Sequence, residues 1–185
     1  RVPNLLFGTG GSGKTTLAKD LARRLGWAYA HHGPPGSRPA NEYARQLLEL
    51  RTPTVMDRFH LGERVYGPLL RGGSGVSPFQ LRVLNRLVNL RGGVVVFCWA
   101  DPLQLAQRLA RDAPQVTLDQ AQRAQEGFKR VQKEVEGQLT MLSYTAENGS
   151  SALRLYDFMG ESVRQLALQA ELAHRVGVRG YGQLR

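Results

Sequence analysis

The chain has 185 residues, of which 42% are hydrophobic and 22% are charged, a composition that fits one soluble globular domain with a single substantial core. No apolar run approaches the roughly 20 residues that a membrane-spanning helix needs, so no membrane partner is expected. Cys98, the only cysteine, lies in an apolar run and cannot form an internal disulfide. Since no signal peptide opens the sequence either, we expect a cytoplasmic protein. A phage protein in the cytoplasm of its host would also fit this expectation.

The formal net charge of +10 is unevenly distributed. Residues 1–92 carry 14 Lys and Arg against 5 Asp and Glu, whereas residues 93–185 carry 11 against 10. No acidic residue lies between Glu63 and Asp101, a stretch that contains five arginines: Arg64, Arg71, Arg82, Arg86 and Arg91. Such a local excess suggests a polyanionic partner. A solvated basic face in an arginine-rich protein is the alternative.

The apolar residues 2–7 predict a short buried strand that leads into a phosphate-binding loop. Residues 8–15 read GTGGSGKT and match the pattern GxxxxGK[ST] at every fixed position. Glycines let backbone N–H groups face a phosphate, and the helix predicted for residues 16–25 adds its positive N-terminal end. Lys14 can reach the β- and γ-phosphates, and the Thr15 hydroxyl can bind Mg²⁺. The ATP-binding residues predicted here are Gly8, Gly10, Gly11, Ser12, Gly13, Lys14, Thr15 and Thr16.

The rest of the chain alternates between strand and helix patterns. Strands are predicted at residues 27–30, 54–56, 94–99 and 152–156, and helices at 41–50, 61–71, 77–90, 103–111, 117–142 and 160–173. This alternation predicts a three-layer α/β fold with a mainly parallel sheet. One domain is expected over residues 1–173, followed by a basic Gly- and Arg-rich tail, 174–185, that we expect to be mobile.

Polar residues follow several of the predicted strands. In parallel sheets ligands bind beyond the carboxyl ends of the strands, so Gly8, His31-His32, Asp57-Arg58 and Asp101 are expected on one rim. Asp57 and Arg58 suit phosphoryl transfer, because the carboxylate can accept a proton or orient a hydroxyl and the guanidinium can bind an acceptor phosphate. An ion pair that caps a helix is the alternative.

The phosphate loop and residues 57–67, DRFHLGERVYG, resemble the thymidylate kinase branch of the nucleoside and nucleotide kinases. The resemblance covers most of residues 4–170 and implies a P-loop kinase fold with a five-stranded, mainly parallel sheet and a small helical lid. It implies that Asp57 and Arg58 face the acceptor and that Tyr66 lines its pocket. It also implies a lid helix after Asp101-Pro102, whose arginines Arg108 and Arg111 stabilise charge on the transferred phosphoryl group.

The acceptor side departs from that family at two points. Gly10 stands where the family usually has an acidic residue, and His31-His32-Gly33-Pro34-Pro35-Gly36 replaces an arginine-containing loop. Some phage proteins that resemble thymidylate kinases phosphorylate the hydroxymethyl group of 5-hydroxymethyluracil in DNA. Together with the basic stretch, these departures favour a resemblance to that branch, which implies this modified pyrimidine in DNA as acceptor. A free deoxynucleoside monophosphate and a polynucleotide 5′ end are alternatives, and so is a P-loop ATPase switch that binds nucleic acid without phosphorylating it.

The predicted site therefore has a donor side and an acceptor side. ATP and Mg²⁺ are the expected cofactors, and the partner is DNA or a free deoxynucleotide. The predicted catalytic residues are Lys14, Asp57, Arg58, Arg108 and Arg111. The predicted acceptor-binding residues are His32, Asp57, Arg58, Glu63, Tyr66 and Arg71.

Overall fold

The computed structural model describes residues 3–8, 12–33, 35–112 and 116–145. In these residues five parallel strands form one sheet in the order β2-β3-β1-β4-β5. The strands are β1 (Pro3–Gly8), β2 (Ala28–His31), β3 (Thr54–Asp57), β4 (Val94–Trp99) and β5 (Thr140–Thr145). The helices are α1 (Lys14–Leu25), α2 (Pro39–Glu49), α3 (His60–Arg71), α4 (Pro78–Leu90), α5 (Pro102–Asp112) and α6 (Leu118–Glu134).

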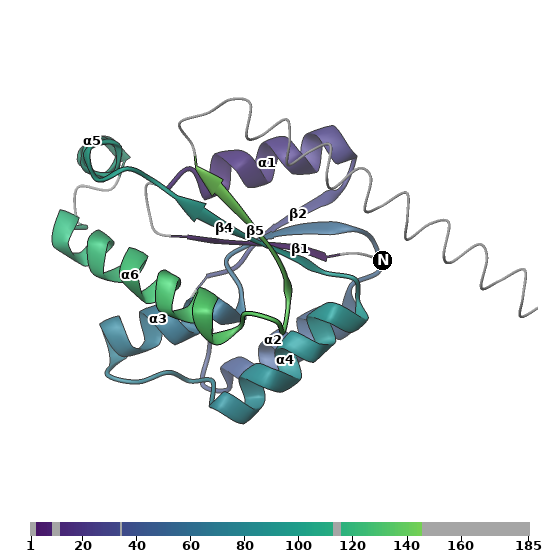
Figure 1. The fold of residues 1–185 in the computed structure, drawn as a ribbon. Coiled ribbons are helices and arrows are strands. Elements are labelled where there is room, and N and C mark those ends of the chain that lie inside the picture. The colour runs from purple at the N-terminus through teal and green to yellow at the C-terminus, as the bar shows by residue number, and fades with distance from the viewer. Residues whose placement is uncertain (1–2, 9–11, 34, 113–115, 146–185) are drawn as a thin grey trace, which may run out of the picture.

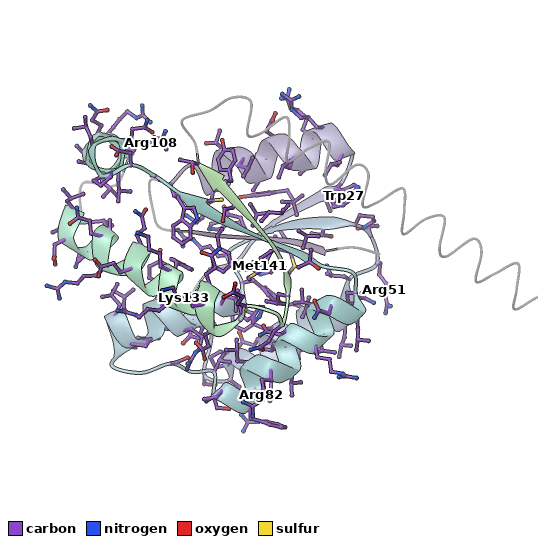
Figure 2. The ribbon with its side chains drawn as sticks, in the orientation of Figure 1. Trp27, Arg51, Arg82, Arg108, Lys133 and Met141 are labelled. Carbon is purple, nitrogen blue, oxygen red and sulfur yellow. The ribbon has the colours of Figure 1, made fainter. Side chains whose placement is uncertain are left out.

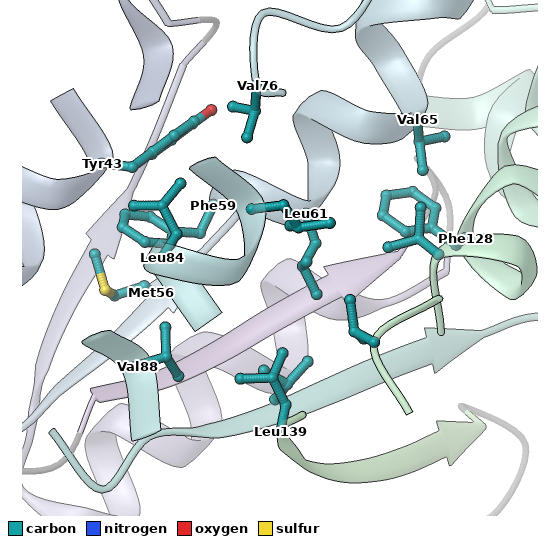
Figure 3. Packing of buried hydrophobic residues seen from close by; sticks show 14 of the residues in the cluster. Tyr43, Met56, Phe59, Leu61, Val65, Val76, Leu84, Val88, Phe128 and Leu139 are labelled. Atoms are coloured by element: carbon teal, nitrogen blue, oxygen red, sulfur yellow. The ribbon is translucent and has the colours of Figure 1, made fainter. Parts of the chain in front are cut away.

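The sheet lies between two layers of helices (Figure 1). On one face α1 packs its buried Leu17 and Leu21 against Val55 and Val96. The other face carries α2, α3, α4 and α6, and the larger apolar cluster fills the space between them and the sheet (Figure 3). Because both faces are covered, β4 consists of a continuous apolar run, VVVFCW. The expected three-layer α/β architecture is confirmed.

Strand alternation determines which helical layer each side chain meets. On β3, Val55 packs in the cluster beneath α1, whereas Met56 packs in the cluster on the opposite face. Asp57 has the same parity as Val55, which places it on the α1 side of the sheet. Along β2, Tyr29 packs on that side as well.

The helix expected over residues 117–142 was wrong in its second half. α6 ends at Glu134, and Gly137 takes a left-handed backbone with φ 75° that a helix cannot continue. Residues 140–145 instead form the edge strand β5, paired in parallel with β4. The strand expected at 152–156, the helix at 160–173 and the tail at 174–185 lie outside the described residues. None of the described helices is long and apolar enough to cross a bilayer.

Candidate active site

The start of α1 presents a positively charged surface to a ligand. Gly13 caps the helix with φ 82°, a left-handed conformation that suits glycine, and Lys14 and Thr15 are the first two helical residues. No acidic residue lies in the first turn, so the partial positive charge of the helix end is not neutralised there. Among the predicted ATP-binding residues, Gly10 and Gly11 lie outside the described residues.

Lys14 is almost fully buried, with 5% of its surface exposed. Burial lowers the pKa of its ammonium group, the charge of Asp57 opposes that shift, and the nearby Arg58 lowers the pKa further. These influences show that a cation, an anion and a second cation lie within electrostatic range of one another. A phosphate at this helix end would relieve the repulsion between Lys14 and Arg58.

Asp57, at the carboxyl end of β3, is bonded directly to the phosphate-loop helix. The Thr15 hydroxyl donates to Asp57 Oδ2 over 2.6 Å, and the carboxylate is fully buried. Its other oxygen, Oδ1, is buried and has no hydrogen-bond partner among the described residues. A hydroxyl beside a carboxylate with one unsatisfied buried oxygen is an oxygen donor set that fits Mg²⁺. Thr15, as predicted, and Asp57 are therefore the residues that could hold the metal.

Two further side chains bind the same carboxylate. Sequence analysis placed His31 on this rim without a role and did not select Tyr29. The Tyr29 hydroxyl lies 3.3 Å and His31 Nδ1 3.2 Å from Asp57 Oδ2. In the strand register His31 pairs with Asp57, and Tyr29, two residues earlier, shares its parity. The sequence shows the alternation of β2 but not the register, which decides that both side chains meet Asp57.

His32 points to the other side of β2. Its backbone N–H donates to the Asp57 carbonyl over 3.1 Å, and its ring packs edge-on against Phe59 with centroids 5.6 Å apart. Burial, and then the neighbouring His31, lower the pKa of His32, so the neutral imidazole is favoured. Its Nε2 atom is buried and has no hydrogen-bond partner within the described part of the chain. A polar group of an acceptor could pair with that nitrogen.

Arg58 is exposed and has φ 67°, the one non-glycine residue among those described with a left-handed backbone. An L-residue in this region is strained by about 1–3 kcal/mol. The strained residue separates Asp57 from α3, so the turn sets the direction in which the guanidinium leaves the strand end. Strain of this kind is typical of functional positions.

The other predicted acceptor residues make contacts inside the protein. Both oxygens of the buried Glu63 accept from Arg71 Nη2, at 2.6 and 2.5 Å, and Glu63 also accepts from the Gly75 N–H at 3.0 Å. This pair closes the loop between α3 and α4. Tyr66 is half-buried and packs edge-on against Phe128 of α6, with ring centroids 5.7 Å apart. A role of these three residues toward an acceptor remains a prediction.

The predicted lid arginines lie on α5, which follows the carboxyl end of β4. The Asp101 carboxylate accepts from the Leu103 N–H over 2.8 Å and so caps this helix. Arg108 donates to Gln104 over 2.9 Å, one turn earlier on the same helix. Its charge also acts on Tyr144 of β5, whose pKa is raised chiefly by burial. Figure 2 shows Arg108 at the end of the molecule where α5 meets the sheet.

The acid-free stretch does not form one basic face. Three of its five arginines bind inside the protein: Arg64 to Glu134 at 2.8 Å, Arg71 to Glu63, and Arg91 to the Leu50 carbonyl at 2.6 Å. Arg82 and Arg86 are exposed on α4, Arg82 lying 6.0 Å from the Phe79 ring centroid. In Figure 2 Arg82 and Arg108 lie on opposite sides of the molecule. Of these five arginines, two are thus paired with carboxylates, one is bonded to a backbone carbonyl, and the two on α4 are exposed.

Comparisons with known proteins agree with this geometry. No family model and no curated protein matches the sequence. Among solved structures, the YorR protein of Bacillus subtilis, in complex with phosphorylated GDP, has a TM-score of 0.70 at 18% identity, covering 94% of this chain and 98% of that one. The fold is P-loop kinase-like. Deoxyadenosine kinase from M. mycoides with bound dATP gives a TM-score of 0.61 at 12% identity, covering 85% of this chain and 98% of that one.

Proposed function

We propose that this protein is an ATP-dependent kinase that transfers the γ-phosphate to a nucleoside or nucleotide. The observation that carries the proposal is the 2.6 Å hydrogen bond between Thr15 and Asp57, beside the buried Lys14. It joins the helix end suited to phosphates to a strand-end carboxylate suited to Mg²⁺. The likeness of the fold to deoxyadenosine kinase supports the same conclusion.

Each residue of the site has a part in such a reaction. Lys14 would bind the β- and γ-phosphates, while Thr15 and Asp57 would hold the metal. Mg²⁺, when bound with ATP, neutralises charge on the phosphates. Arg58 would bind the acceptor or the phosphate in transfer, because it is exposed and close to Lys14. Arg108 and Arg111 would approach the γ-phosphate when the lid closes, which excludes water and limits hydrolysis of ATP.

A free nucleoside or nucleotide is the first candidate acceptor. The arginines that suggested a polymeric acceptor are engaged with Glu134, Glu63 and Leu50 or lie on the outer face of α4. Because these arginines of the described residues form no basic path to the site, they give little of the electrostatic attraction that dominates binding of nucleic acids. A small acceptor needs no such path.

5-Hydroxymethyluracil in DNA is the second candidate. It is favoured by the exposed cationic side chains of Arg38 and Arg58, which follow β2 and β3. These residues lie close in sequence to the carboxyl ends of the strands, where a flipped base would enter. Phosphate contacts there would position a strand without reading its sequence.

A transfer assay with γ-³²P-ATP tests the proposal and separates the acceptors. It offers nucleosides, deoxynucleoside monophosphates, ordinary DNA and DNA containing 5-hydroxymethyluracil. We expect label in a mononucleotide product. Label in hydroxymethylated DNA alone would establish the second candidate, and label at the ends of ordinary DNA would indicate a polynucleotide kinase. Hydrolysis of ATP without any labelled acceptor would contradict a kinase and indicate an ATPase switch.

The double variant Arg82→Glu/Arg86→Glu is the matched control. It reverses charge on the outer face of α4 and leaves the residues around Lys14 unchanged. Transfer to a mononucleotide should keep the wild-type rate. A loss of transfer to DNA alone would show that a nucleic acid uses this face.

A further inference from the structure

We propose that Tyr29 and His31 of β2 are positioning residues, which orient the Asp57 carboxylate toward the metal–nucleotide complex. The inference rests on the proposed function, because it assigns Asp57 a place beside Mg²⁺ and ATP. It adds two residues that the phosphate-loop pattern does not contain. Neither residue needs to touch the substrate for this role.

Three donors converge on one oxygen of Asp57. Thr15 Oγ1 lies at 2.6 Å, His31 Nδ1 at 3.2 Å and the Tyr29 hydroxyl at 3.3 Å, all from Oδ2. An ionised carboxylate can only accept hydrogen bonds, so Nδ1 of His31 must carry a proton. Thr15 belongs to α1, whereas Tyr29 and His31 belong to β2, so Oδ2 accepts hydrogen bonds from two different elements.

The convergence leaves the other oxygen available. Asp57 is fully buried, and Oδ1 has no hydrogen-bond partner among the described residues. An unsatisfied buried carboxylate oxygen is costly and calls for a cation, a water molecule or another donor. Rotation of the carboxylate would exchange the two oxygens and break three hydrogen bonds. The β2 donors therefore hold Oδ1 in the orientation in which it can serve a metal or its bound water.

The position of β2 makes these contacts specific. His31 pairs with Asp57 in the register, and the His32 N–H donates to the Asp57 carbonyl over 3.1 Å, so the strand ends are bound at the point of contact. The Tyr29 ring is held in turn, because it packs in the cluster beneath α1 and Lys19 Nζ lies 5.9 Å from its centroid. β2 is an edge strand of four residues, so these contacts of Tyr29, His31 and His32 hold its carboxyl end beside β3.

Binding of the fluorescent nucleotide mant-ATP, in Mg²⁺ and in EDTA, tests the inference without relying on turnover. In the wild type Mg²⁺ should raise the affinity. His31→Ala should reduce that metal-dependent gain about 10-fold, the scale observed when a group that orients a metal ligand is lost, and leave the affinity in EDTA unchanged. His31→Asn, whose amide nitrogen can replace Nδ1, should retain most of the gain. Tyr29→Phe should lose part of it.

A purely structural role predicts a different pattern. Melting followed by circular dichroism would then show a lower midpoint for His31→Ala, with affinity reduced equally in Mg²⁺ and EDTA. That outcome, or a full metal-dependent gain in folded His31→Ala and Tyr29→Phe, would overturn the inference. If the wild type binds mant-ATP in neither solution, the proposed function fails and the inference fails with it. If Mg²⁺ raises the affinity of the wild type for mant-ATP, the proposed function stands whatever the variants show.

Discussion

The Thr15 hydroxyl and the Asp57 carboxylate, 42 residues apart in the chain, are joined by a 2.6 Å hydrogen bond. The contact connects the first turn of α1 with the end of β3, the strand beside β1 in the sheet. It also explains why Asp57 can be buried as an anion, since a buried charge requires hydrogen-bonding partners. The proposed donor site thus depends on two elements that only the fold brings together.

Asp57→Asn should remove transfer and leave ATP binding in EDTA within a few fold of the wild type. The amide keeps the shape of the side chain but lacks the negative charge that a metal ligand needs. We expect a fall in kcat of about 10²–10⁴-fold, the range associated with loss of one preorganised catalytic group. Single-turnover transfer with saturating ATP measures it. Normal turnover in a folded Asp57→Asn protein would refute a catalytic role for this carboxylate.

Arg58→Gly should separate stability from activity. Glycine adopts φ 67° without a steric penalty, so removing the strain should raise the free energy of unfolding by up to about 1 kcal/mol despite the entropy of the more flexible unfolded chain. Transfer should fall because the guanidinium is lost. Urea unfolding and steady-state kinetics measure the two effects.

Arg58→Ala is the matched control for that experiment. Alanine keeps the strain and lacks the guanidinium, so its activity should match that of Arg58→Gly while its stability stays near the wild-type value. If both variants retain wild-type kcat/KM for every acceptor, Arg58 has no role in binding the reactants.

Arg71→Ala should destabilise the fold more than its own exposure suggests. Among the described residues, the substitution leaves the buried Glu63 carboxylate with the Gly75 N–H as its one hydrogen-bond partner, which costs about 1–3 kcal/mol, the usual cost of an unsatisfied buried polar group. Arg71→Ala combined with Glu63→Gln should recover part of the loss, because no buried charge remains. Urea unfolding of the two single variants and the double variant gives the coupling between the residues. Strict additivity would contradict the pairing.

Stability should fall as the pH drops from about 6.5 to about 4 because of His60. Burial lowers the pKa of this fully buried imidazole to about 4, while the hydrogen bond to Asn85 opposes the shift. The unfolded state, with a pKa near 6.5, therefore binds more protons in this window, and stability rises with pH through it. The contribution is at most about 3 kcal/mol and is fully present above pH 6.5.

His60→Gln should flatten that part of the pH profile. The glutamine amide nitrogen can donate to Asn85 Oδ1, as His60 Nε2 does over 2.8 Å in the folded protein, and glutamine does not titrate. Burial also lowers the pKa of His32, so a smaller slope of the same sign should remain. Urea unfolding at several pH values measures the difference. An unchanged slope in His60→Gln would show that His60 is not its source.

The Cys98 thiol should resist alkylation in the folded protein. Burial raises its pKa to about 12, so the reactive thiolate is scarce at neutral pH and the sulfur is inaccessible. Iodoacetamide should label the single cysteine only as denaturant unfolds the chain. The extent of labelling should rise with denaturant concentration at the same midpoint as the unfolding curve. Fast labelling of the native protein would contradict the buried position at the end of β4.

The sequence predicted what depends on local pattern. Glycine spacing identified the phosphate loop, the apolar run VVVFCW identified β4, and Ser77 marked the start of α4, where it forms a capping box with Gln80. The prediction of the end of α6 was wrong, because apolar residues continue at helical spacing past Glu134. The helix ends there because Gly137 takes a left-handed backbone, which the spacing of side chains does not show.

The sequence predicted part of the candidate site, and the roles of its residues remain predictions. Strand ends indicated that Asp57 lies near the phosphate loop, but the register that brings Tyr29 and His31 onto it is a property of strand pairing. The interpretation of the net charge was limited for a similar reason. Ion pairs such as Arg64 with Glu134 join residues 70 positions apart, and composition cannot reveal such neutralisation.

The most direct test of the account is transfer of label from γ-³²P-ATP to a nucleoside or nucleotide by the wild type and by Lys14→Ala, measured side by side. Lys14 is the buried cation at the start of α1, and the account assigns it to the β- and γ-phosphates. It predicts a labelled product with the wild type and none above background with a folded Lys14→Ala protein. Equal label with both proteins, or ATP consumed by the wild type without a labelled product, would contradict a kinase site at this helix.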